Sequence, residues 1–251
     1  MEMHRFGDRA VVVTGGASGI GKATAARLAG EGGRVAIWDV QLDAARSLAD
    51  AIGGRAYRCD VSDPLSVERA AGATRDQLGR ISGLVNAAGI LPIEGGVEEA
   101  SVEDWDRVLD TNLRSVFLTA KHLVPAMRDA EGSAIVNIAS IYGLRGYPDE
   151  CAYDASKGGV VNLTRQMALQ LAPAIRVNAV APGPIETPMM QAELRSGETL
   201  DEIRSRWSDL VPIRRLGDPD EVAAVIAFLL SHDSSYVSGA IVPVDGGMLA
   251  A

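Results

Sequence analysis

The stretch TGGASGIGKAT, residues 14–24, contains a glycine-rich run whose spacing fits two different phosphate-binding turns. Each turn belongs to a different class of nucleotide-binding fold. Read from Gly16, it nearly matches a nucleoside-triphosphate loop, with four residues between two glycines and then a lysine. That loop needs a hydroxyl directly after the lysine to hold magnesium, and Ala23 stands there. Read from Gly15, its three glycines have the spacing of a dinucleotide-binding turn.

The next apolar run favours the dinucleotide. RVAIWD, residues 34–39, ends in Asp39, roughly 20 positions beyond the glycines, where an acidic side chain accepts hydrogen bonds from an adenosine ribose. The glycines let the backbone approach a pyrophosphate, whose charge then meets the amides of a helix that begins near Gly19. Because the Asp39 carboxylate would repel a 2′-phosphate, the predicted cofactor is NAD rather than NADP.

On both sides of this turn, apolar runs of strand length alternate with segments of helix length. Near-continuous apolar character is typical of parallel strands that helices cover on both faces. The predicted strands are 9–14, 34–39, 55–61, 81–89, 133–140, 174–182 and 239–244, and the predicted helices are 19–31, 41–51, 64–79, 101–129, 152–172 and 219–231. Capping signals at Asp63, Ser101 and Asp218 begin three of these helices. The alternation predicts α/β architecture: a Rossmann-like, doubly wound, seven-stranded parallel sheet in a single domain, residues 1–251.

The bulk composition excludes several classes of partner. A formal net charge of -9 argues against nucleic acid. The longest apolar stretch, VAAVIAFLL at 222–230, is too short to span a bilayer, and the start MEMHRFGDRA has no apolar signal core. Cys59 and Cys151 are too few for a disulfide framework, and no His or Cys cluster has metal-ligand spacing. We therefore expect a soluble, cytoplasmic protein with no metal and no membrane partner.

The functional site is expected where the strands end. Ligands of open α/β sheets bind at the carboxyl ends of the strands. The residues at those ends are Gly15 to Gly21, Asp39, Asp60, Asn86 to Gly89, Ser140 and Pro182–Gly183.

A second constellation suggests proton transfer. Tyr153 and Lys157, in AYDASKGGV, are four residues apart in a predicted helix, so their side chains share one face. A free phenol has a pKa near ~10, too high for ready proton exchange near neutrality. An ammonium about 4 Å away contributes on the order of 4 kcal/mol at an effective dielectric of ~20, which lowers that pKa, and desolvation opposes the effect. Ser140 could hold a substrate oxygen beside the phenol.

Taken together, these motifs resemble those of the short-chain dehydrogenase/reductase family. TGGASGIG, VNAAG, Asn112 in LDTNLRSVF, Ser140, YDASK and APGPIET occur in the family's order and spacing, and the resemblance continues to GAIVPVDGG at 239–247. It therefore covers essentially the whole chain. One departure is Ala87, which stands where the family usually has a second asparagine after Asn86, and it leaves a side-chain role at position 87 in doubt.

The resemblance implies a role for each matching residue. Tyr153 would be the general acid/base, Lys157 would lower its pKa and bind the nicotinamide ribose, Ser140 would orient the substrate, and Asn112 would hold a water that links Lys157 to solvent. Asp60 and Val61 would contact adenine, and Thr187 the nicotinamide carboxamide. The implied cofactor contacts are Gly15, Ser18, Gly19, Ile20, Gly21, Asp39, Asp60, Val61, Asn86, Ala88, Gly89, Tyr153, Lys157, Pro182, Gly183, Ile185 and Thr187.

The segment 184–215 is too long for a simple connection and is predicted to be a substrate lid. It contains Met189, Met190, Leu194 and Trp207, which would suit an apolar substrate; packed surface helices with no contact to substrate are the alternative. Leu91, Tyr142, Tyr147 and Cys151 are further candidates for the pocket wall.

Three functions follow from these patterns. The leading one is hydride transfer between NAD(H) and a secondary alcohol or ketone. Reduction of 3-oxoacyl thioesters on an acyl carrier protein is the alternative within the fold, disfavoured by Asp39 and by the acidic surface. The third is a catalytically idle nucleotide-binding protein. The resemblance also implies a homotetramer that packs through 101–129, 152–172 and the C-terminal strand, although the small residues of 152–172 also suit burial within one chain.

Overall fold

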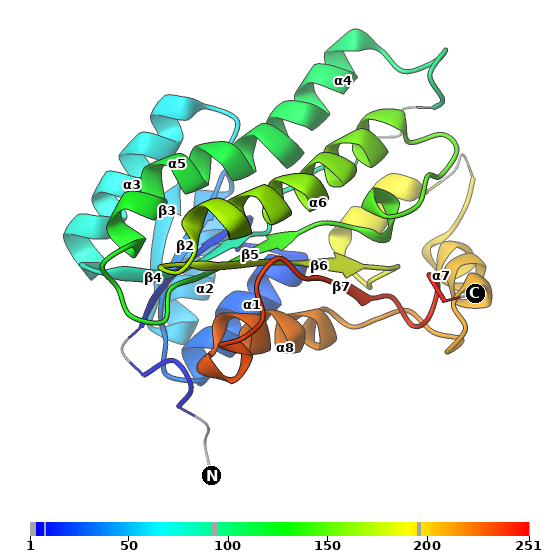
Figure 1. Cartoon of the computed structure of the whole chain (residues 1–251). Helices are drawn as coiled ribbons and strands as arrows, with labels where there is room; N and C mark the ends of the chain where they lie inside the picture. Colours follow the sequence, from blue (N-terminus) through cyan, green and yellow to red (C-terminus); the bar gives the residue numbers. More distant parts are fainter. Residues whose placement is uncertain (1–3, 8, 92–94, 195–196, 251) are drawn as a thin grey trace.

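A single sheet of seven parallel strands forms the centre of the molecule (Figure 1). This computed structural model describes residues 4–7, 9–91, 95–194 and 197–250, so residues 195–196 of the predicted lid lie outside the described residues. In order across the sheet, the strands are β3 (Arg55–Arg58), β2 (Arg34–Asp39), β1 (Ala10–Thr14), β4 (Ile81–Asn86), β5 (Ala134–Ile138), β6 (Arg176–Pro182) and β7 (Ile241–Val244). The strand order reverses between β1 and β4, which creates a crevice at their carboxyl ends.

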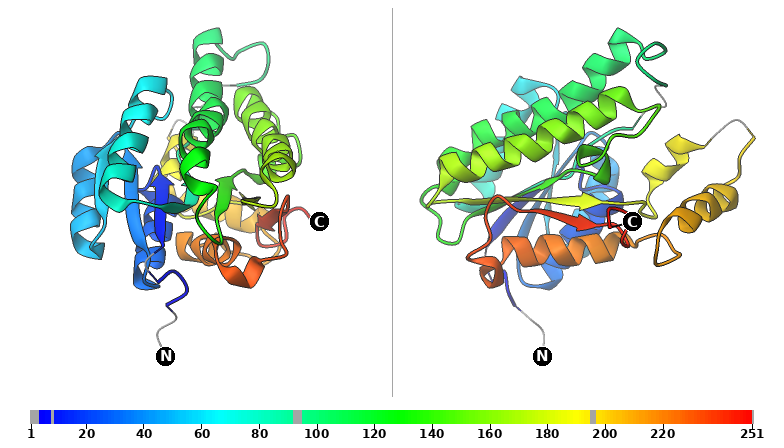
Figure 2. Two further views of the ribbon diagram at one scale, coloured as in Figure 1. Left: turned by 60° about the vertical axis from the view of Figure 1, so that its left-hand side comes forward. Right: turned by 45° about the vertical axis from the view of Figure 1, so that its right-hand side comes forward.

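Helices cover both faces of this sheet, as predicted. On one face lie α1 (Gly19–Gly30), α2 (Leu42–Ile52) and α8 (Pro219–Leu230); on the other lie α3 (Pro64–Leu78), α4 (Val102–Leu109), α5 (Ser115–Met127) and α6 (Cys151–Leu171) (Figures 1 and 2). Both faces of the central strands are therefore buried, with Val11, Val12 and Val13 of β1 fully covered. Among the described residues, no helix is long and apolar enough to cross a membrane.

The predicted capping residues begin their helices. The Asp63 carboxylate accepts a hydrogen bond from the Leu65 amide, and the Ser101 hydroxyl accepts one from the Asp104 amide, both at 3.0 Å. The Asp218 carboxylate accepts one from the Asp220 amide at 2.8 Å. Each cap satisfies an amide that has no partner inside its helix.

One predicted helix is wrong in form. The expected continuous helix 101–129 is divided by a widened π-helical turn at Asp110–Arg114, and its second part ends at Met127. The turn carries Asn112, whose buried side chain is bonded to the loop after β4. This tertiary contact, which no local pattern encodes, is the reason the helix departs from regular spacing, and such bulges are frequent at functional sites.

Several strands are also shorter than predicted. The run 81–89 pairs only as far as Asn86, and 55–61 only as far as Arg58. Apart from Asp60, the residues beyond these points are apolar or small, like the strands, but they leave the sheet and line the crevice.

Two arginines hold the C-terminal end of α8. The Arg176 guanidinium donates to the carbonyls of Leu229 (2.9 Å), Ser231 (2.9 Å) and Val237 (3.2 Å). Arg9 donates to the Leu230 carbonyl at 3.0 Å. Cations at this end of a helix satisfy its last carbonyls and complement its dipole.

Replacing Arg176 with methionine is expected to lower the free energy of unfolding by about 2–3 kcal/mol, because it leaves several half-buried carbonyls without a donor. Urea unfolding measures this change. Arg75→Met, at an exposed position of α3, is the control and should change stability by less than about 0.5 kcal/mol. Equal effects of the two substitutions would contradict this account of Arg176.

Candidate active site

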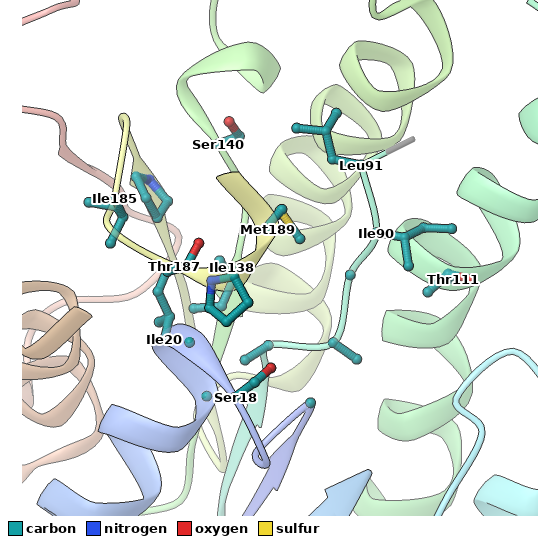
Figure 3. Close-up of a pocket in the computed structure, with 18 of the residues that line it drawn as sticks. Ser18, Ile20, Ile90, Leu91, Thr111, Ile138, Ser140, Ile185, Thr187 and Met189 are labelled. Carbon is teal, nitrogen blue, oxygen red and sulfur yellow. The ribbon is translucent and has the colours of Figure 1, made fainter. Parts of the chain in front are cut away.

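A cleft of about 620 Å³ lies at the carboxyl ends of the strands. It runs from Ser18 and Ile20 at the start of α1, past Thr187 and Met189, to Ser140 and Leu91 (Figure 3). The structure brings together nearly all of the predicted site residues along this cleft; those that line it are Gly15, Ser18, Gly19, Ile20, Gly21, Asp39, Asp60, Val61, Ala88, Gly89, Ser140, Tyr153, Lys157, Pro182, Gly183, Ile185 and Thr187.

The glycine turn is packed too tightly for side chains. Gly15 has φ +61°, and a Cβ there would lie 2.7 Å from the Ala88 Cα atom. A Cβ on Gly21 would collide with the Gly15 carbonyl oxygen. The turn therefore brings the backbone at the start of α1 to the cleft, where the Ser18 side chain makes no capping hydrogen bond. First-turn amides that line a cleft at a helix N-terminus fit the pyrophosphate of a dinucleotide.

Asp39 ends β2 at the edge of the same cleft. One carboxylate oxygen accepts a hydrogen bond from the Ala17 amide at 3.0 Å, and the other accepts one from the Gln41 amide at 2.9 Å. These two contacts fix the orientation of the carboxylate and also tie the glycine turn to β2. Each carboxylate oxygen can accept a second hydrogen bond, so the group can still receive ribose hydroxyls.

Thr14 is a site residue that the sequence analysis missed. Its hydroxyl oxygen accepts hydrogen bonds from the Ala87 amide at 3.1 Å and from the Ala88 amide at 3.2 Å. The loop after β4 is thus held to β1 through its backbone, which explains why alanine is tolerated at position 87. The position of Thr14 at the end of β1 was a signal that could have identified it.

Tyr153 and Lys157 come together as their spacing predicted. Both are buried, and the Lys157 Nζ atom lies 5.5 Å from the centroid of the Tyr153 ring. The same ammonium donates to the Ile138 carbonyl at 2.9 Å. Burial lowers the pKa of Lys157 from 10.5 to about 8, because desolvation disfavours the charged form. The amine therefore remains protonated at neutral pH, close to the phenol.

Ser140 lies two residues after the end of β5 and lines the same cleft as Tyr153 and Lys157. It begins a short 3-10 turn at Ile141–Gly143, and its hydroxyl oxygen accepts a hydrogen bond from the Tyr142 amide at 3.2 Å. The hydroxyl hydrogen can then point toward a ligand oxygen in the cleft.

Asn112 is completely buried and does not line the cleft. Its side-chain amide donates to the Ile90 carbonyl at 2.9 Å, and its side-chain oxygen accepts from the Ile90 amide at 2.8 Å. The backbone of Gly89 packs closely against the side chains of Asn112 and Lys157. A Cβ atom on Gly89 would lie 3.3 Å from the Asn112 side-chain oxygen and 3.6 Å from the Lys157 Nζ atom. Asn112 thus fixes the wall of the cleft beside the lysine.

Asn86 is likewise placed behind the cleft rather than along it. Its amide nitrogen donates to the Asn137 side chain at 2.8 Å, and its oxygen accepts from the Thr119 hydroxyl at 2.7 Å. Asn137 in turn donates to Thr164 at 2.9 Å. This chain of four buried polar side chains joins β4 and β5 to α5 and α6 and so fixes the helices that carry the site.

The segment 184–215 contributes part of the cleft wall. It contains a 3-10 segment at Pro188–Glu193 and the helix α7 (Leu200–Leu210), which lies beyond the carboxyl ends of β6 and β7 (Figure 2). Met189, Met190 and Trp207 line the cleft. Leu194 packs in the apolar cluster behind them but does not line the cleft.

An ion pair ties α7 to the rest of this segment. The Arg204 guanidinium binds the Glu186 carboxylate with N···O distances of 2.6 and 2.9 Å. Thr187, the next residue, packs against the glycine turn, where a Cβ on Gly19 would lie 3.4 Å from the Thr187 side chain. Of the other predicted wall residues, Leu91 and Tyr142 line the cleft, whereas Tyr147 and Cys151 do not.

The sheet, the switch-point cleft and the buried tyrosine–lysine pair define an α/β protein of the dinucleotide-binding class. Residues 15–249 match a family model described as enoyl-(acyl carrier protein) reductase. Levodione reductase of Leifsonia aquatica is 40% identical over 98% of this chain and 96% of its own length. Cyclohexanol dehydrogenase of Acinetobacter sp. (strain SE19) is 41% identical over 97% of this chain and 96% of its own.

The fold agrees equally well with a solved structure. A crystal structure of levodione reductase superposes with a TM-score of 0.93, at 39% identity, and covers 98% of this chain and 99% of that one. The chain belongs to the short-chain dehydrogenase/reductase family. It is therefore an oxidoreductase that uses a nicotinamide cofactor.

Proposed function

We propose that this protein is an NAD-dependent dehydrogenase that interconverts secondary alcohols and ketones. The observation that carries the proposal is the buried Tyr153–Lys157 pair, with the lysine Nζ atom 5.5 Å from the ring, in a cleft that also contains Ser140 and Asp39. The two relatives, a levodione reductase and a cyclohexanol dehydrogenase, support the same class of reaction.

In this proposal Tyr153 exchanges the proton. Its phenol gives a proton to the ketone oxygen during reduction and takes it back from the alcohol during oxidation. The bound nicotinamide supplies or accepts the hydride. Ser140 donates a hydrogen bond to the substrate oxygen and so holds it beside the phenol, and the Lys157 ammonium stabilises the phenolate through its charge.

The proposed cofactor contacts follow the length of the cleft. The amides at the start of α1 would hold the pyrophosphate, and Asp39 would accept the adenosine ribose hydroxyls. Asp60 and Val61 would contact adenine, and Thr187 the carboxamide. Asn112 is proposed to act indirectly, by holding the backbone of the cleft wall in place, because its side chain is hydrogen-bonded to the backbone of Ile90. Asn86 is proposed to act indirectly as well, through its buried hydrogen bonds to Asn137 and Thr119.

The preference for NAD is tested by Asp39→Asn, which keeps the shape of the side chain and removes its charge. We expect the ratio of kcat/KM for NADP to that for NAD to rise about 30-fold, the factor that corresponds to about 2 kcal/mol of screened repulsion between two negative charges. Steady-state kinetics with both cofactors measure it. Asp43→Asn, at a fully exposed carboxylate on α2 that does not line the cleft, is the control. A wild-type enzyme that prefers NADP would refute this interpretation of Asp39.

The proposed activity is tested by offering NAD and NADP with a panel of secondary alcohols and following the absorbance of reduced nicotinamide. We expect oxidation with NAD for neutral, apolar alcohols. The absence of turnover with every alcohol and every ketone, in both directions, would contradict the proposal.

A second candidate is the reduction of acyl thioesters on a carrier protein. The match to a family model that is described by its acyl-carrier-protein reductases favours it. The net charge of -9 opposes docking of an acidic carrier. Comparison of kcat/KM for an acetoacetyl thioester with that for simple ketones distinguishes the two candidates.

We also propose that the protein is a cytoplasmic homotetramer. The two long helices on one face carry exposed apolar side chains, with Phe117 of α5 51% exposed and Leu169 of α6 84% exposed in the single chain. Packing of these helices against a second copy would cover them. Size-exclusion chromatography with light scattering measures the assembly, and a monomer would contradict the proposal.

A further inference from the structure

Two more tyrosine rings stand next to Tyr153. Tyr142 and Tyr147 are stacked, with ring centroids 4.1 Å apart and planes inclined by 18°. Tyr142 also meets Tyr153 in an edge arrangement, with centroids 5.5 Å apart and planes at 82°. Tyr142 lines the cleft together with Ser140, so a substrate held by Ser140 and Tyr153 must extend its carbon skeleton along this ring.

The pair of rings is held rigidly. The Tyr142 amide donates to the Ser140 hydroxyl oxygen, which restrains the backbone that carries the ring, and the ring itself is packed between Tyr147 and Tyr153. The Tyr147 amide donates to the Asp154 carboxylate at 2.7 Å, and Asp154 directly follows Tyr153 on α6. Both rings are therefore anchored to residues adjacent to the predicted acid/base.

Apolar side chains predominate around Tyr142, which packs at the edge of a cluster that includes Ile141, Met190, Ile203 and Trp207. The apolar side chains that line the cleft with it include Leu91, Ile141, Met189, Met190 and Trp207. Arg107 and Thr111 also line the cleft, and the Arg145 guanidinium lies 5.8 Å from the centroid of the Tyr147 ring. Two unbranched methionines can adapt to the shape of a ligand, whereas the stacked rings cannot.

We propose that the Tyr142–Tyr147 pair is an aromatic platform that selects ketones and secondary alcohols whose reacting carbon belongs to a saturated carbon ring. A ring is already rigid and can lay one face on the platform while the methionines cover the other. An open chain with the same number of carbons buries the same atoms only after several of its torsions are frozen, and each frozen torsion weakens binding. The proposal rests on the proposed alcohol dehydrogenase function and names its substrate class.

The test compares cyclohexanone with 2-hexanone, because both have six carbons and neither is chiral. In wild-type enzyme we expect kcat/KM for reduction of cyclohexanone to exceed that for 2-hexanone about 10-fold or more. Tyr142→Leu should bring this ratio down about 10-fold, which corresponds to about 1.4 kcal/mol, because it removes the flat surface against which the ring of the substrate packs. Tyr147→Leu, which removes only the support behind Tyr142, should lower it about 3-fold.

Matched variants separate the ring surface from the hydroxyl. Tyr142→Phe and Tyr147→Phe keep the stacked platform and should keep the wild-type ratio. A wild-type enzyme without ring preference, or an unchanged ratio in a folded Tyr142→Leu protein, would overturn the proposal. A fall of the cyclohexanone-to-2-hexanone ratio of kcat/KM in the phenylalanine variants would also overturn the proposal, because the hydroxyls rather than the ring faces would then select the substrate.

A binding measurement distinguishes failure of the proposed platform from failure of the proposed dehydrogenase activity. Calorimetric titration of the two ketones into enzyme saturated with NAD reports binding without turnover. If wild-type enzyme reduces neither ketone, the proposed function fails, and the platform is still supported by tighter binding of cyclohexanone that Tyr142→Leu abolishes. Equal binding of the two ketones, or binding of neither, overturns the platform.

Discussion

Tyr153→Phe is expected to reduce kcat by about 1,000-fold or more, because positioned acid/base groups contribute roughly 100- to 10,000-fold to a rate and the variant has no hydroxyl at this position. The substitution keeps the ring, and with it the contact to Tyr142 and the nearby lysine. Cofactor affinity, measured by fluorescence titration with NADH, should therefore change less than about 3-fold.

The control for this prediction is Tyr57→Phe. Tyr57 lies on β3, the strand at one edge of the sheet. Its hydroxyl donates to the Gln77 side chain at 3.1 Å. Its loss should leave kcat unchanged. A Tyr153→Phe enzyme that retains more than about a tenth of the wild-type kcat would exclude the phenol as the principal proton donor.

Lys157→Met is expected to inactivate the enzyme and at the same time to stabilise the folded chain. The loss of the ammonium beside Tyr153 should lower kcat about 100-fold or more, since the phenolate then lacks its compensating charge. A catalytic group that costs stability is a known form of the compromise between activity and stability.

The stability effect follows from the pKa of Lys157, which burial lowers from 10.5 to about 8. Below pH 8 the amine is protonated in both the folded and the unfolded chain, so the full cost of burying the charge, about 3 kcal/mol, opposes folding. Between pH 8 and 10.5 the folded chain releases this proton while the unfolded chain keeps it, so the free energy of unfolding contributed by this group rises with pH.

Methionine removes this cost but leaves the Ile138 carbonyl without its donor, which costs about 1–2 kcal/mol. The net expectation at pH 7 is a gain of about 1–2 kcal/mol for the variant without cofactor. This gain should fall to zero at about pH 9–9.5 and become a loss of about 1 kcal/mol near pH 10.5, where only the missing hydrogen bond remains. Urea unfolding of both proteins at several pH values measures it. Lys22→Met, at an exposed position of α1, should show no such pH-dependent difference. A variant less stable than wild type at pH 7 would contradict the assigned cause.

Local pattern was sufficient for the sheet, most helices and the pairing of Tyr153 with Lys157. Apolar runs such as RVAIWD and caps such as Asp63 act through neighbours in the chain, so their effect can be read from the sequence. Residues four apart on a helix must share a face, which made the approach of Lys157 to Tyr153 predictable before the helix was seen.

The contacts between elements could not be predicted in this way. The widened turn at Asp110–Arg114 exists in a segment whose residues suit a regular helix, and Thr14 holds the Ala87 and Ala88 amides across 73 and 74 positions of sequence. The same holds for Asn86, a predicted cofactor contact, whose side chain bonds to Thr119 and Asn137. A polar side chain at a strand end can face either the cleft or a neighbouring helix, and only packing decides which.

The sequence by itself therefore determined the order of strands and helices, the glycine turn, the acidic end of the second strand and the shared face of Tyr153 and Lys157, because each depends on spacing within one segment. Only the tertiary structure decided the clamp of Asn112 on Ile90, the burial that lowers the pKa of Lys157 and the stack of Tyr142 on Tyr147. Those features arise where separate segments exclude water from one another, and the free energy of such contacts depends on distances that spacing along the chain does not specify.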